Sequence, residues 1–188
     1  MKININKRYR SLLTSKLVED EETTTQTEQL EYQLTRQTRR RLIMAITSAI
    51  CNSFKQEILV GTHNLTASSG NTFKIALYTS SASLGASTTA YSTSNEISNT
   101  SGSAYTAGGA TLTSVTPTLD SSTAVCDFAD VSFTSATFTA NGALIYNDTQ
   151  SDKAVAVIAF GGDKTVTSGT FTIQFPTADA SNAIIRIA

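Results

Sequence analysis

The sequence contains few charged residues, one histidine, two cysteines, two prolines and no tryptophan. Charged side chains make up 15% of the 188 residues, well below the roughly 25% of typical soluble domains. The net charge of −1 gives no reason to expect binding to nucleic acid or to an anionic membrane. The sequence has no apolar run close to the roughly 20 residues of a membrane span, and no apolar segment typical of a secretory signal. We therefore expect a protein that is made in a cytoplasm and remains soluble there.

Too few cysteines and histidines are present for most metal and nucleophile chemistry. Cys51 and Cys126 are interpreted as unpaired core residues, because a disulfide framework would need more cysteines. His63 cannot complete a zinc site with two distant cysteines that lack C-x-x-C spacing. A Cys51–His63 nucleophile pair is not favoured, because His63 lies in a polar turn after the helix that carries Cys51. The sequence therefore predicts no catalytic, metal-binding or cofactor-binding residue, and no enzymatic activity.

Several aspartates of the β region are candidate calcium ligands by residue type. The best oxygen cluster is "NDTQSD", with Asn147, Asp148 and Asp152, but it lacks the residue order of an EF-hand loop. Asp127 and Asp130 are three residues apart in a predicted strand and should face opposite sides. We interpret these aspartates, and also Asp120, Asp163 and Asp179, as turn residues that bond to their own backbone. "GGDK" at 161–164 is interpreted as a tight turn between strands rather than a phosphate-binding loop.

Charge divides the chain at residue 43. Residues 1–43 hold 15 of the 29 charged side chains and carry a net charge of +3, whereas residues 44–188 carry −4. Residues 1–43 are poor in apolar side chains, so we predict an N-terminal arm or linker, helical or extended, that orders only on a partner. The cluster Arg39–Arg41 is interpreted as a solvated helix end rather than a nucleic-acid contact. Met44 is a possible second translation start.

An amphipathic helix is predicted over residues 44–61. Ile46, Ile50, Phe54 and Ile58 recur every four residues, and Gly61 follows where a helix C-cap would lie.

The remaining residues, 62–188, show the pattern of a mainly β domain. Alternating apolar residues recur at intervals of 8 to 14 residues, separated by Gly, Asn, Asp and Ser. Asn141-Gly142 is a strong hairpin-turn signal. The predicted fold is an antiparallel β-sandwich or barrel of about eight strands. Its expected strands are 73–79, 111–116, 123–128, 131–139, 143–147, 154–160, 170–175 and 183–187.

A Ser/Thr-rich excursion at 79–110 separates the first two predicted strands. Between Thr79 and Ser114, 18 of 36 residues are Ser or Thr and Glu96 is the only charge. Tyr91, Ile97 and Tyr105 could anchor it, so we expect an ordered excursion across the surface; a low-complexity segment is the alternative.

The stretch "SDKAVAVIAFGGDKTVTSGTFTIQF" at 151–175 reads as strand, turn and strand. Its first strand is apolar on both faces, because Val155 and Val157 point to one side and Ala156 and Ile158 to the other. We interpret this as a surface covered by other copies or other proteins. Ser and Thr on the strands fit that interpretation, since interfaces are depleted in Lys, Glu and Asp.

Residues 44–188 resemble a family of small structural proteins of tailed bacteriophages, of the type found in marine and cyanobacterial phages. The resemblance lies in segments such as "MAITSAICNSFKQEILVGTHN", "FKIALYTSSASLGASTTAYSTSNE" and "AVAVIAFGGDKTVTSGTFTIQFPTADASNAIIRIA". It implies a virion component without catalytic residues. Members of the family typically begin at the equivalent of Met44, and the additional 43 residues depart from that pattern.

Two functions are weighed. The first is a non-enzymatic virion structural protein, a capsid decoration, neck or tail component assembled in the host cytoplasm as a homo-oligomer. Its partners would be copies of itself and other virion proteins. The alternative is a receptor-binding module of a tail or head fibre, in which the excursion and Tyr78, Tyr91 and Tyr105 contact a host glycan or surface protein. The first is favoured.

Overall fold

The computed structural model describes residues 26–33, 45–98 and 104–188. The chain divides into two compact units, Met1–Ile43 and Met44–Ala188. In the first unit residues 26–33 form a helix, and the rest of the predicted arm, including Arg39–Arg41, lies outside the described residues.

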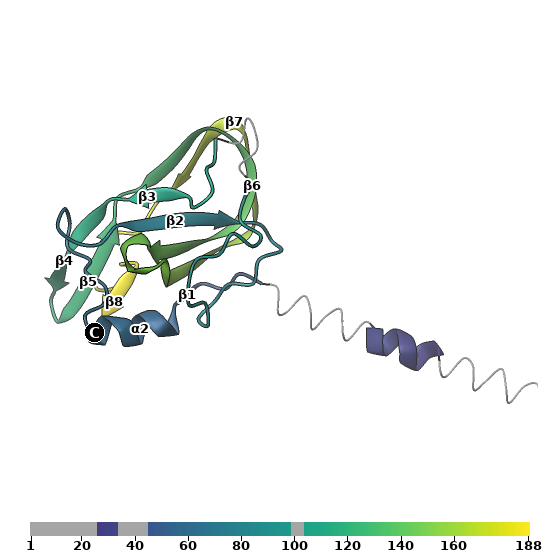
Figure 1. Cartoon of the computed structure of the whole chain (residues 1–188), viewed down its shortest axis with the longest axis horizontal. Coiled ribbons are helices and arrows are strands. Elements are labelled where there is room, and N and C mark those ends of the chain that lie inside the picture. The colour runs from purple at the N-terminus through teal and green to yellow at the C-terminus, as the bar shows by residue number, and fades with distance from the viewer. Residues whose placement is uncertain (1–25, 34–44, 99–103) are drawn as a thin grey trace, which may run out of the picture. The chain divides into compact units, whose positions relative to one another are not determined.

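The second unit is mainly β, and its described strands form two antiparallel sheets (Figure 1). The larger sheet has the order β1-β7-β6-β2-β3 and the smaller sheet the order β4-β5-β8. The predicted antiparallel β fold is therefore confirmed. The elements are β1 (Ala49–Ile50), α2 (Asn52–Leu59), β2 (Phe73–Tyr78), β3 (Ala110–Leu112), β4 (Ser114–Asp120), β5 (Thr123–Phe128), β6 (Val131–Asn147), the 3-10 turn η1 (Asp148–Gln150), β7 (Lys153–Ile173) and β8 (Ile185–Ile187).

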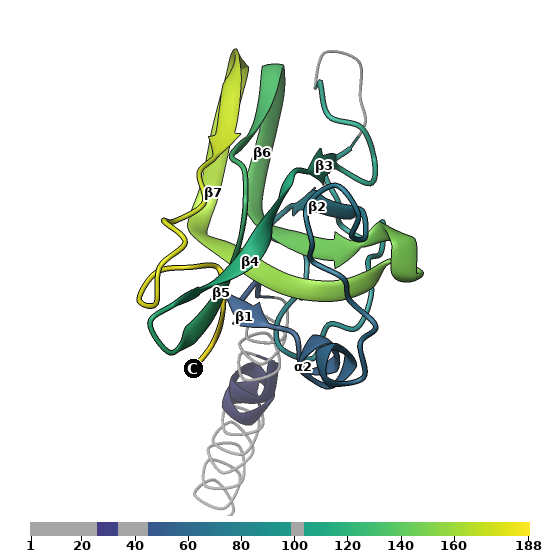
Figure 2. The ribbon, with the colours of Figure 1, turned by 90° about the vertical axis from the view of Figure 1, so that its left-hand side faces the viewer.

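A long hairpin of β6 and β7 forms the centre of the larger sheet. A straight strand rises about 3.3 Å per residue, so two residues eleven positions apart would lie about 36 Å apart. The rings of Phe160 and Phe171, both on β7, are nevertheless only 5.9 Å apart. The hairpin is therefore strongly bent. In Figure 2 the part of β6 and β7 away from their connecting turn rises above β2 and β3.

Bulges bend the hairpin where the sequence predicted turns. Ala140 pairs with Lys164 and Gly142 with Ala159, so four residues of β7, three more than in a regular pairing, lie opposite one residue of β6. Gly161 and Gly162 have φ angles of 72° and 138°, and Asn141 Nδ2 donates to Asp163 Oδ1 across the bulge. The predicted turns at Asn141-Gly142 and at 161–164 are thus wrong. Flexible residues placed opposite one another bend a strand pair instead of ending it.

Two further bulges form a second bend. Ser135 and Ser168 have φ angles of 53° and 48°, and the register shifts beside each of them. Phe133 and Phe138 flank this bend with their rings 6.0 Å apart, and both contact the ring of Tyr105. The bent hairpin therefore encloses an aromatic part of the core.

The strand that is apolar on both faces is covered within the chain. Ala154, Val155, Ala156 and Val157 are all buried in the single core cluster, and α2 packs against β7. The interpretation that these residues need cover from another copy is therefore wrong. The bend of the sheet together with the packing of α2 buries both faces of this part of β7.

The helix predicted over 44–61 is shorter, because α2 begins at Asn52 and ends at Leu59. The preceding residues are extended: Thr47 N donates to Leu84 O, Cys51 N donates to Val155 O, and β1 pairs with β7. A spacing of four residues fits both a helix, with period 3.6, and a strand, with period 2. Ile46 and Ile50 therefore matched the helical pattern although pairing with β7 and the excursion decides their conformation.

Gly142 lies where the extended segment crosses β6. A Cβ atom at this position would lie 2.6 Å from Ile46 Cγ2 and 2.6 Å from Ile158 O. Since the second atom belongs to the backbone, the strand pair cannot relax around a side chain. Glycine at position 142 therefore serves close packing.

Replacing this glycine should cost stability. We expect Gly142→Ala to lower the free energy of unfolding by about 1–3 kcal/mol through overpacking. Gly85→Ala is a matched control, because its Cβ would meet nothing closer than 4.0 Å, and its effect should stay within about 0.5 kcal/mol. Urea denaturation of both variants measures the difference, and equal stabilities would contradict the proposed crowding.

Candidate functional site

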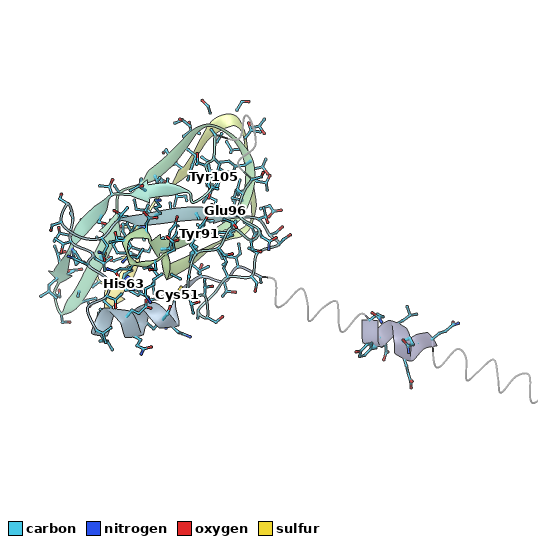
Figure 3. All side chains as sticks on the ribbon, in the orientation of Figure 1. Cys51, His63, Tyr91, Glu96 and Tyr105 are labelled. Atoms are coloured by element: carbon cyan, nitrogen blue, oxygen red, sulfur yellow. The ribbon has the colours of Figure 1, made fainter. Side chains whose placement is uncertain are left out.

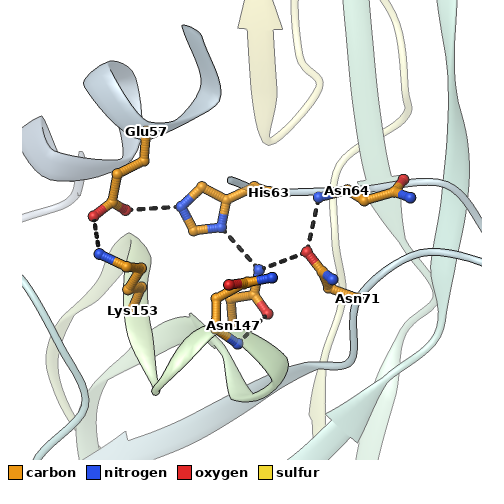
Figure 4. Close-up of polar contacts among 7 residues, drawn as sticks. Glu57, His63, Asn64, Asn71, Asn147 and Lys153 are labelled. Atoms are coloured by element: carbon orange, nitrogen blue, oxygen red, sulfur yellow. Dashed lines mark hydrogen bonds and ion pairs between the residues drawn. The ribbon is translucent and has the colours of Figure 1, made fainter. Parts of the chain in front are cut away.

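A cluster of polar side chains joins α2, the following loop and the end of the β6–β7 hairpin (Figure 4). Glu57 of α2 accepts a hydrogen bond from His63 Nε2 at 2.8 Å through Oε2. Its Oε1 forms an ion pair with the Lys153 ammonium at the start of β7. The side chain of His63 is fully buried, and that of Glu57 is 16% exposed. One carboxylate thus connects three segments.

The second nitrogen of His63 faces an amide. Asn147 Nδ2 lies 2.9 Å from His63 Nδ1, and because an amide nitrogen only donates, Nδ1 accepts and Nε2 carries the proton. The ring of Phe54 covers the imidazole, with the ring centres 4.8 Å apart. His63 was expected in a polar turn, and the structure instead places it in the interior.

Asn147 extends the network to the loop before β2. It is completely buried, and its Nδ2 also donates to Asn71 Oδ1 at 3.0 Å while its Oδ1 accepts from Gln150 N. Asn71 Oδ1 further accepts from Asn64 N at 2.8 Å. Asn147 belongs to the oxygen cluster that the sequence offered for calcium, and the structure gives it a structural role instead. The sequence signal for this role is its position directly after a run of apolar strand residues.

The arrangement supports stability rather than proton transfer. A general base needs a free lone pair within reach of a substrate, and in His63 both nitrogens are already engaged. Burial by itself would raise the pKa of Glu57, but the hydrogen bonds from Lys153 and His63 and the positive charge of Lys153 outweigh it and lower that pKa. Glu57 therefore remains a carboxylate that holds the three segments together.

Glu57→Gln should lower stability near neutral pH by about 1–3 kcal/mol, because it leaves buried donors with a poorer acceptor. Since the folded-state pKa of Glu57 lies below its ordinary value, its contribution is present above about pH 4.5 and is lost as the pH falls through the folded-state pKa. The difference between wild type and variant should therefore shrink in acid. Urea denaturation at several pH values checks this.

Lys55→Gln is the control, because Lys55 lies on the same helix and its ammonium donates to Asn52 Oδ1 on the exposed side. Its effect should stay within about 0.5 kcal/mol at every pH. A Glu57→Gln effect that is equally large in acid would contradict the assigned role of the carboxylate.

A second carboxylate, Glu96, holds the excursion. Its Oε2 accepts from Tyr91 Oη at 2.6 Å, and its Oε1 accepts from Tyr105 Oη and Gly108 N, both at 2.7 Å. Figure 3 shows Glu96 between the two tyrosines. Tyr105 Oη also accepts from Leu77 N of β2 at 2.9 Å. The only charge of the excursion therefore fixes it to the sheet.

The tyrosines of the excursion are structural. Tyr78 and Tyr105 are each 1% exposed, Tyr78 Oη donates to Ser92 O, and the half-buried Tyr91 stacks on Tyr146. Burial, together with the negative charge of Glu96, raises the pKa of Tyr91 and Tyr105, so both phenols stay protonated and donate. The expectation of an ordered excursion is confirmed for residues 79–98 and 104–110. Of the three tyrosines considered for receptor binding, Tyr78 and Tyr105 are buried and Tyr91 is half-buried.

Glu96→Gln should loosen the excursion, because the amide NH2 group would take the place of an oxygen that accepts a hydrogen bond from Tyr91 Oη or from Tyr105 Oη and Gly108 N. We expect faster backbone amide exchange in residues 91–98 and 104–109, and a stability lower by about 1–3 kcal/mol. Hydrogen exchange with mass spectrometry provides the measurement. Ser94→Ala, at an exposed position nearby, should leave the exchange pattern unchanged.

The two thiols are buried and unpaired, as expected. Burial raises the pKa of Cys51 and of Cys126 to about 11, so neither is a reactive thiolate at neutral pH.

The aspartates bond mainly to backbone and to nearby side chains. Asp130 accepts from Phe175 N, Asp120 from Ala180 N and Asp179 from Ser181 N, while Asp148 pairs with Lys74. Among the described residues, no group of three His, Cys, Asp or Glu side chains is placed to share a metal ion.

A hollow under the first half of the excursion is a different kind of candidate site. It has a volume of about 410 Å³ and lies between Tyr78 and Asn95 in the sequence. Seven of its twelve lining residues are Ser or Thr, and none of the twelve is charged.

Comparisons with known proteins found no matching family model, curated protein or solved structure. Within the described ranges, no helix has the length and apolar character required to cross a membrane.

Proposed function

We propose that this chain is a non-enzymatic structural protein of a tailed-bacteriophage virion, a capsid decoration, neck or tail component that acts through protein–protein packing. The observation that carries the proposal is the exposed edge strand β4, which has no charged side chain before its last residue, Asp120. Val115 to Leu119 are five consecutive exposed residues, and among the described strands β4 pairs with β5 alone. An edge strand of this kind is suited to contact with another chain.

Apolar side chains extend from this edge across the small sheet. Leu119 is 73% exposed and Val115 is 44% exposed on β4, and Ile187 is 55% exposed on β8. Leu119 pairs with Ala124, and Ala124 pairs with Ile187. Leu119, Ala124 and Ile187 therefore form one row on one face of the small sheet. Monomeric proteins commonly protect an edge with charged side chains. Here Pro117 and a bulge between Val115 and Thr118 interrupt β4, but no charge precedes Asp120.

The resemblance of residues 44–188 to phage structural proteins supports a virion as the place of this assembly. The partners would be copies of the chain and other virion proteins. A sheet surface rich in Ser and Thr supports the same proposal, because hydroxyl groups can be packed without burying unpaired charge. Symmetric self-association is the usual arrangement for such a module.

Self-association through β4 can be measured on the full chain by analytical ultracentrifugation at several concentrations. We expect wild-type protein to form oligomers and the double variant Val115→Lys with Leu119→Lys to weaken association at least about tenfold, because it places two ammonium groups in the contact. Leu59→Lys is the matched control, since Leu59 is 85% exposed on α2, outside the small sheet. It should associate as wild type does.

Location in the particle is the second part of the test. Antibodies against the chain should label intact virions, and a density map of the particle should contain the β domain in repeated copies. A wild-type chain that stays monomeric at all concentrations and is absent from purified particles would overturn the proposal.

The receptor-binding alternative is less favoured, because two of its three candidate tyrosines, Tyr78 and Tyr105, are buried, whereas Tyr91 is half-buried. Only the hollow under the excursion favours a binding role on this side of the molecule.

A further inference from the structure

The hollow under the excursion is lined by residues between Tyr78, at the end of β2, and Asn95. Its volume of about 410 Å³ falls in the range of roughly 300–1,000 Å³ that is typical of small-molecule sites. Ala82 and Leu84 form apolar parts of the lining, and hydroxyl-bearing side chains form most of the rest. The site is therefore large enough for one or two sugar rings.

Several lining hydroxyl groups are available for a ligand. Thr88 Oγ1 accepts from Gly85 N and Ser92 Oγ accepts from Ser94 N, so these two serve the loop itself. In contrast, Ser81, Ser87 and Thr89 are exposed, and their hydroxyl groups form no hydrogen bond within the described part of the chain. Each can both donate and accept.

The walls of the hollow are held in place before any ligand binds. Tyr78 Oη donates to Ser92 O at 2.7 Å, and Glu96, just beyond the lining, is fixed by Tyr91 and Tyr105. On the other side, Leu84 forms an isolated parallel β-bridge with Ile46, and Ala86 O accepts a hydrogen bond from Asn52 N. A site that is already ordered loses less conformational entropy on binding.

We propose that this hollow binds a neutral carbohydrate. Ligands with charged groups would find no counter-charge, because none of the lining residues is charged. An apolar ligand would leave the hydroxyl groups without partners. A polyhydroxylated neutral molecule matches them, since each sugar hydroxyl both donates and accepts. This site does not include β4, so the inference is independent of the proposed assembly role.

The test is an NMR titration of ¹⁵N-labelled full-length chain with maltotriose, cellotriose and mannotriose, each tested separately, and with sialyllactose as the charged comparator. We expect at least one neutral trisaccharide to bind with a dissociation constant in the millimolar range and to shift amide signals within residues 78–95. Sialyllactose should bind more weakly than that sugar.

A triple variant, Ser81→Ala with Ser87→Ala and Thr89→Val, removes the three available hydroxyl groups at exposed positions. We expect it to weaken binding at least about tenfold through the loss of hydrogen bonds to the sugar. Thr167→Val, which removes an exposed hydroxyl from β7, is the matched control and should bind as wild type does.

Three outcomes would overturn the inference: no shift with any of the three neutral sugars, shifts scattered outside residues 78–95, or tighter binding of sialyllactose. The wild-type shift map decides the question even if the triple variant folds poorly. Sugar binding by a chain that stays monomeric and is absent from purified particles would contradict only the assembly role, and self-association without sugar binding would contradict only this site.

Discussion

The bending of the β6–β7 hairpin is the constraint on which the rest of the domain depends. β6 pairs with β2 on one side, β7 pairs with β1 on the other, and the bend brings Phe133, Phe138 and Phe171 into one aromatic cluster. A hairpin of 17 and 21 residues that stayed straight would leave much of its apolar surface in water. The bulges that bend it therefore allow a small domain to bury both faces of its central strands.

Scarcity of charge shapes how the polar groups are satisfied. Most buried polar contacts are neutral amides, phenols and backbone groups, as in the Asn147–Asn71 chain. Two carboxylates with several partners, those of Glu57 and Glu96, each fix a segment that lacks regular secondary structure. Single ionised groups with several donors are strong, directional connections, so a few of them suffice.

The same scarcity leaves two kinds of surface available for function. β4 presents an uncharged sheet edge with apolar side chains, which is suited to packing against another protein. The hollow under the excursion presents hydroxyl groups without charge, which are suited to a neutral ligand. The two surfaces are separate, because the β4 edge contributes no residue to the hollow.

The sequence by itself determined the fold class, the unpaired core thiols and the ordered excursion, since period-2 patterning and anchoring aromatics are local signals. It also located the flexible positions at Asn141-Gly142 and 161–164. Only the tertiary structure decided that these positions face each other and bend one hairpin, because a bulge and a turn need the same backbone freedom. Likewise, only tertiary pairing decided that residues before Asn52 are extended. The burial of His63 and Tyr78 depends on segments far away in the chain, and no local pattern contains that information.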